Sequence, residues 1–227
     1  MGNPKRVIEG TRLRILQLLQ KNQSNTVDGL AGAMELAPAT IRRHLDILQR
    51  DRLVSFREVR KKTGRPEYSF FLTEDGQEAL PKDYDQLLGM MVQELAVMES
   101  DDLAGQSGEE VLHLVLRRVS ERVAGEYQNQ VDGEPLESRL VTLLSHLRQE
   151  DFSPETDVVD GRLKIKLLNC PFRSVALQNK AICSFDANLI SLLLNVDVER
   201  EDCIHDGASS CTYSAVLAPQ ELESIAG

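Results

Sequence analysis

The four cysteines of this chain all lie in its last quarter. They are Cys170, Cys183, Cys203 and Cys211, and the 169 residues before them contain none. Twelve residues separate the first two, 19 separate the second from the third, and seven separate the last two. Thiols gathered in this way can ligate a metal, pair as disulfides, or pack as small apolar side chains.

The N-terminus helps to decide between metal ligation, disulfides and unligated thiols. MGNPKRVIEG has no apolar segment typical of a secretory signal, and no apolar run is long enough to cross a membrane. We therefore expect a cytoplasmic protein with reduced thiols, which disfavours disulfides. Zinc sites usually include two cysteines only a few residues apart, a pair that this chain lacks, whereas iron–sulfur clusters accept wider spacing. Soft thiolates suit both metals, so zinc, a cluster and unligated cysteines stay open.

The segments around the cysteines predict a small α+β scaffold. DVVDGRLKIKLLNC predicts a hairpin that turns at Asp160-Gly161 and ends at Cys170. VDVERED predicts a strand that leads to Cys203, and CTYSAVL predicts another that begins at Cys211. Because strand ends and loops at one end of a scaffold can meet, we expect the thiols to converge.

A helix is expected directly after Cys183. Ser184 or Asp186 could cap its N-terminus. Its core face holds four apolar residues at helical spacing, namely Leu189, Ile190, Leu193 and Leu194.

The N-terminal third has the opposite charge from the rest of the chain. Residues 1–80 carry 14 Lys and Arg against 10 Asp and Glu, whereas residues 81–227 carry 12 against 26. A basic segment on an acidic chain indicates that the first part meets an anionic partner and the second does not.

Three short helices and a basic hairpin make up this basic segment. The spacing of apolar residues predicts helices in TRLRILQLLQKN, in VDGLAGAM and after Pro38, with a tight link before the third. This order predicts a helix-turn-helix whose third helix presents Thr40, Arg42 and Arg43 to double-stranded operator DNA. Strands expected at 54–59 and 67–72 form a wing, whose tip carries the cations Lys61, Lys62 and Arg65.

The winged helix resembles that of ArsR/DeoR-type bacterial regulators, and most of all the SufR group of iron–sulfur repressors. The resemblance lies in TIRRHLDILQRDRLV and in a wing that closes with Gly64, Arg65, Pro66, Tyr68, Leu72, Thr73 and Gly76, followed by Pro81 and Tyr84. SufR-type repressors also share cysteines at the spacing of Cys170, Cys183 and Cys211.

This resemblance implies that the three cysteines ligate a cluster, expected to be [4Fe–4S]. It also implies that the cluster-bound protein represses genes for iron–sulfur cluster assembly. Cys203 lies outside the three-residue pattern, and we expect it to supply the fourth thiolate, with His205 as its rival.

Helices with apolar stripes are predicted between the two ends of the chain. Leucine and methionine recur at helical spacing in 84–98, and two further stripes follow before residue 150. Winged-helix regulators bind two half-sites as dimers, so we expect Tyr84–Met98 to join two copies into a homodimer. No role is assigned to His113 or His146.

The sequence thus predicts three parts: a winged helix-turn-helix at 1–80, a helical linker and dimerisation region at 81–150, and a Cys-rich α+β sensor domain at 151–227. We expect a regulator whose operator binding is controlled by a cluster. One alternative is a winged-helix regulator with structural zinc that senses a small ligand elsewhere. Another is an electron-transfer or cluster-carrier protein. We expect no enzyme, because no nucleophile–base set, phosphate loop or carboxylate pair stands out.

Overall fold

The computed structural model describes residues 8–59 and 67–218. The chain forms two compact units, Met1–Pro81 and Lys82–Gly227, which we call the N-terminal unit and the C-terminal unit. Each has its own hydrophobic core. None of the described helices is long and apolar enough to cross a membrane.

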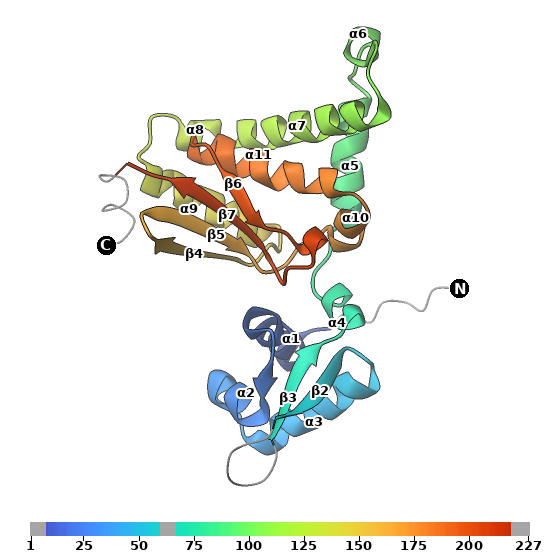
Figure 1. Ribbon diagram of the computed structural model, residues 1–227, viewed down its shortest axis with the longest axis vertical. Helices are drawn as coiled ribbons and strands as arrows, with labels where there is room; N and C mark the ends of the chain where they lie inside the picture. Colours follow the sequence, from blue (N-terminus) through green and yellow to red (C-terminus); the bar gives the residue numbers. More distant parts are fainter. Residues whose placement is uncertain (1–7, 60–66, 219–227) are drawn as a thin grey trace. The chain divides into compact units, whose positions relative to one another are not determined.

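The N-terminal unit is a winged helix (Figure 1). Its three strands form an antiparallel sheet in the order β1-β3-β2, and β2 and β3 are the two sides of the wing. The elements in chain order are α1 (Gly10–Asn22), β1 (Asn25–Thr26), α2 (Val27–Met34), α3 (Pro38–Arg50), β2 (Val54–Val59), β3 (Glu67–Leu72) and α4 (Glu74–Glu78).

Local signals fix where these helices begin. The hydroxyl of Thr26 caps α2 by accepting from the Gly29 amide, and Pro38 occupies the first turn of α3. The predicted apolar stripe of α3, Ile41, Leu45 and Leu48, is buried in the core. The expected third helix and the expected wing strands are therefore confirmed.

The C-terminal unit combines helices with one antiparallel sheet in the order β4-β5-β7-β6. Its helices before the sheet are α5 (Tyr84–Leu95), α6 (Ser100–Leu103), α7 (Gly108–Glu126), α8 (Gln128–Val131) and α9 (Leu136–Gln149). Its remaining elements are β4 (Pro154–Val159), β5 (Arg162–Leu167), α10 (Arg173–Gln178), η1 (Lys180–Ile182), α11 (Cys183–Leu194), β6 (Glu199–Asp202), η2 (Ile204–Asp206) and β7 (Cys211–Val216).

The hairpin β4–β5 turns where the sequence predicts. Asp160 and Gly161 have φ angles of 51° and 74°, the left-handed conformations that a two-residue hairpin turn requires. Along β5, Leu163, Ile165 and Leu167 are buried while the residues between them are only half-buried. This alternation places one face of the sheet against the core.

Helix α11 forms the centre of the C-terminal unit. It contacts both α7 and α9, and Figure 1 shows α7 and α11 side by side. All four apolar residues of its predicted core face are buried. Helices from 84–149 and the Cys-rich segment therefore share one core. The expected boundary near residue 80 coincides with the division between the units, whereas the one expected at 150/151 falls inside the C-terminal unit.

The fold class is α+β with an N-terminal winged helix-turn-helix, as the sequence predicts. One detail differs from expectation. Helix α11 begins at Cys183 without a side-chain cap, because Ser184 donates to the Ala181 carbonyl and Asp186 is buried in the core.

Candidate metal centre and DNA-binding surface

The third helix carries the predicted DNA contacts on its outer side. Arg42 and Arg43 are exposed, and Thr40 is half-buried in the first turn. Arg42 faces the wing, where it lines a groove with Phe56 and Tyr68. The other predicted contacts, Lys61, Lys62 and Arg65, lie outside the described residues.

The base of the wing is built by the Leu-Thr-x-x-Gly segment that the sequence singles out. The Thr73 hydroxyl donates to the Arg52 carbonyl at 2.6 Å and accepts from the Gly76 amide at 3.0 Å. A Cβ at position 76 would overlap the carbonyl oxygen of Leu53. Glycine is therefore required sterically where β3 passes into α4.

The four cysteines are buried at one end of the sheet. Cys203 directly follows β6, Cys211 begins β7, and Cys170 follows β5 by three residues. The end of β5 pairs with the start of β7, and the end of β6 lies on the other side of that start. Cys183, the first residue of α11, completes the group.

Three of the sulfurs are in contact. The Sγ atoms of Cys183 and Cys203 are 3.6 Å apart, and those of Cys203 and Cys211 are 4.0 Å apart. Cys203 therefore lies between the other two. The Cys211 sulfur also accepts from the Ile204 amide at 3.5 Å.

Cys170 shares electrostatic neighbours with the other thiols. Burial raises the pKa of Cys170, and the charges of Asp186 and Cys211 add to the increase. Burial raises the pKa of Cys183 as well, with further contributions from Asp186, Cys203 and Cys170. Thiols with raised pKa values keep their protons until a cation replaces them.

Asp186 is a fifth polar side chain at this end of the unit. It is 5% exposed, its Oδ2 accepts from the Tyr213 hydroxyl at 3.4 Å, and its Oδ1 is buried without a hydrogen-bond partner. Burial raises the pKa of Asp186 to about 7. This side chain is not among the site residues that the sequence predicts. Its position three residues after Cys183 on a helix was the available signal, because such residues share a face.

Arg200 brings a positive charge to the thiols. Burial lowers its pKa, but the neighbouring groups of Cys203, Tyr213 and Cys183 outweigh that effect and raise it. Arg200 is not among the predicted site residues either.

His205, the rival fourth ligand, has another contact. Its Nδ1 is 2.9 Å from the carbonyl oxygen of Ala176 on α10. Within the described part of the chain, no three His, Cys, Asp or Glu side chains are arranged as a ready-made site for one metal ion. The thiols thus converge on one another without surrounding a common point.

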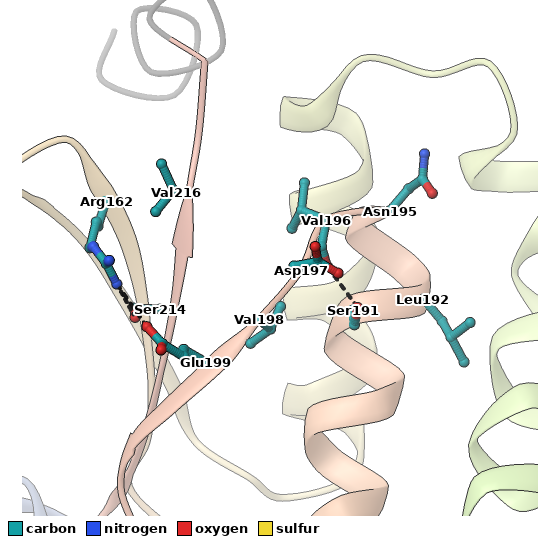
Figure 2. Close-up of a pocket in the computed structure, with 10 residues that line it drawn as sticks. All are labelled: Arg162, Ser191, Leu192, Asn195, Val196, Asp197, Val198, Glu199, Ser214 and Val216. Atoms are coloured by element: carbon teal, nitrogen blue, oxygen red, sulfur yellow. Dashed lines mark hydrogen bonds and ion pairs between the residues drawn. The ribbon is translucent and has the colours of Figure 1, made fainter.

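A groove of about 830 Å³ opens at the opposite ends of the same elements. Figure 2 shows it between the end of α11, with Ser191 and Leu192, and the sheet, with Arg162 and Ser214. Arg162 donates to the Ser214 hydroxyl and pairs with Glu199. No cysteine lines this groove.

Comparisons with known proteins give a family match for the N-terminal unit. Residues 9–55 match the bacterial regulatory protein, arsR family, model. The crystal structure of Bacillus subtilis PadR in complex with operator DNA is a structural match at 14% identity, covering 81% of this chain and 97% of that chain with a TM-score of 0.29. No curated protein gives a significant match.

The C-terminal unit matches a second family model. Residues 86–215 match methanogen output domain 1, and this range includes more than half of the chain and all four cysteines. Together with the arsR-family helix-turn-helix that precedes it, this match makes the chain a DNA-binding transcriptional regulator that belongs to the methanogen output domain 1 family.

Proposed function

We propose that this regulator responds to a metal centre held by its cysteines, and that the state of this centre controls operator binding by the winged helix. The observation that carries the proposal is the contact of three buried thiols from separate segments, with a fourth buried thiol, Cys170, at the same end of the sheet. Chance burial of single cysteines is common, but it does not bring three sulfurs into contact.

The donor set fits a soft metal. Four thiols are the usual ligands of iron–sulfur clusters and of structural zinc. Arg200 would offset part of the negative charge that four thiolates bring. Metal binding would release protons from the thiols and tie the ends of β5, β6, β7 and α11 together. Loss of the metal would loosen this end of the C-terminal unit.

The first candidate is a [4Fe–4S] cluster, as the resemblance to SufR-type repressors implies. In that case the cluster-bound protein represses genes for iron–sulfur cluster assembly, and cluster shortage releases the operator. Such control requires the operator affinity to differ with and without the cluster.

Zinc is the second candidate, because two sulfur separations are close to those of a tetrahedral site, and zinc binding would have to bring the thiols around one common point. A tetrahedral ion bound to sulfur at about 2.3 Å holds neighbouring sulfurs about 3.8 Å apart. The observed separations of 3.6 and 4.0 Å bracket that value. Cys203 takes part in both contacts, so we propose Cys203 rather than His205 as the fourth ligand.

We also propose that the regulator acts as a homodimer through α5. Leu88, Val92 and Leu95 are spaced along one face of this helix and are 63%, 54% and 48% exposed. The neighbouring faces of α5 point to the core, where Leu87 is buried and Met91 is packed. Two winged helices joined in this way would bind two half-sites.

The test is metal analysis of protein purified without air. A brown sample with about four irons and four sulfides per chain supports the cluster, and zinc without sulfide supports the second candidate. Cys211→Ser should lose the metal and shift operator affinity in a gel-shift titration, whereas His205→Ala should keep both. A wild-type protein that binds neither iron nor zinc after anaerobic reconstitution would overturn the proposal.

A further inference from the structure

Cys203 lies within reach of two other thiols. Its sulfur is 3.6 Å from that of Cys183 and 4.0 Å from that of Cys211. A disulfide bond is about 2.05 Å long, so the closer pair needs an approach of about 1.6 Å to bond. Cys203 precedes the short helix η2 and Cys183 begins α11, so a bond between them would join two elements across 19 intervening residues.

We propose that Cys183 and Cys203 form a reversible disulfide when a peroxide oxidises the protein. The first thiol attacks one oxygen of the peroxide, which breaks the O–O bond and gives a sulfenic acid and water. The second thiol then attacks the sulfenic sulfur, the S–S bond forms, and a second water leaves. Two thiols lose two electrons, and hydrogen peroxide is reduced to two waters.

The surroundings of the pair set the rate of this reaction. Both thiols are buried, so the reaction should be slower than that of an exposed cysteine.

The disulfide would compete with the proposed metal centre. A sulfur bound to another sulfur cannot ligate a metal as a thiolate, so the oxidised protein should take up no metal until it is reduced. The bond itself does not depend on the proposed function, but its effect on operator binding does.

The experiment uses the full chain, reduced and treated with a chelator, then exposed to hydrogen peroxide. After denaturation, the oxidised protein should have two free thiols instead of four, and peptide mapping should find Cys183 joined to Cys203. Leu192→Ala, an exposed position on the same helix as Cys183, is the matched control and should form the same bond at the wild-type rate. Cys183→Ser should form the bond between Cys203 and Cys211 instead, more slowly because of the longer separation.

Cys203→Ser and Cys203→Ala both remove the shared partner, and we expect oxidation of thiol pairs in them to slow by about tenfold or more. Oxidation at the wild-type rate in both, or a wild-type bond that maps to Cys170, would overturn the proposal. The two proposals fail separately: a chain that binds no metal but forms this bond contradicts only the proposed function, and a chain that binds metal but keeps four thiols contradicts only the disulfide.

Discussion

At the scale of single residues, the candidate site depends on side chains that the sequence could not connect. Cysteines stand out because they are few, but Asp186 and Arg200 are ordinary charged residues until the fold places them beside the thiols. Sequence spacing could suggest that the thiols converge. It could not show that Cys203 lies between two others, because that depends on the side-chain packing of α11 against the sheet.

Arg43 is the residue through which DNA recognition is most directly tested. It is exposed on α3, away from the buried Ile41, Leu45 and Leu48. We expect Arg43→Ala to weaken operator binding by about 1–3 kcal/mol, the usual loss when an arginine contact to a base is removed. A gel-shift titration measures this loss. Arg117→Ala, an exposed arginine on α7, is the control and should bind as the wild type does. Equal binding by both variants would contradict the placement of α3 in the groove.

His146 should make stability depend on pH. It is buried and lies 3.0 Å from the Tyr127 hydroxyl. Burial lowers its pKa, although Glu150 and Glu126 oppose the shift. Below about pH 6.5 the unfolded chain binds a proton at this histidine that the folded chain resists. The free energy of unfolding should therefore fall as the pH drops from 7.5 to 5.5.

The variant His146→Gln isolates this contribution, because glutamine does not titrate. Each unit by which the pKa is lowered corresponds to about 1.4 kcal/mol. Urea unfolding of the two proteins at both pH values gives the difference. If the wild type and the variant lose the same free energy between pH 7.5 and 5.5, His146 is not the group responsible.

At the scale of elements, local signals were enough for the hairpins and the helices of the winged helix. Both wing strands lie where the sequence predicts them, at Val54–Val59 and Glu67–Leu72. The stripe in 84–98 was harder to interpret. Periodicity shows that a helix has an apolar face. Whether another element covers that face depends on the rest of the fold. On α5 the apolar stripe is covered only in part.

A substitution at Gly76 tests the junction between β3 and α4. In Gly76→Ala the new methyl group would overlap the Leu53 carbonyl, which also accepts from the Thr73 amide. We expect the N-terminal unit to lose about 1–3 kcal/mol of stability, as overpacked sites do. Hydrogen exchange should show faster exchange in peptides from α1 to β3 but not in peptides from the C-terminal unit.

The matched control is Gly32→Ala in α2, where a Cβ would meet no atom within 4 Å. This change should leave the N-terminal unit as stable as before or stabilise it by about 0.5–1 kcal/mol. Equal protection in the Gly76 and Gly32 variants would show that the junction tolerates a side chain.

At the scale of the whole molecule, the chain divides into two compact units between Pro81 and Lys82. The charge change near residue 80 marks the border between the two cores. Helices α5, α7 and α9 were expected to form a region of their own, yet α11 packs against α7 and α9. Contacts between elements so far apart in sequence leave no periodic signal. The thiols therefore lie in the same core as the proposed dimer helix.

The proposed dimer can be tested by one substitution on α5. Val92 is exposed on α5, and Val92→Glu would place a charge in the middle of the face formed with Leu88 and Leu95. We expect analytical ultracentrifugation to give a dimer for the wild type and a monomer for the variant. Operator affinity should fall by roughly a hundredfold, because one winged helix then binds one half-site without its linked neighbour. Metal content per chain should not change, since the thiols belong to one chain. Val141→Glu is the control: this valine is 63% exposed on α9, and the variant should remain dimeric. A dimeric Val92→Glu protein, or a monomeric Val141→Glu protein, would mean that two copies meet elsewhere.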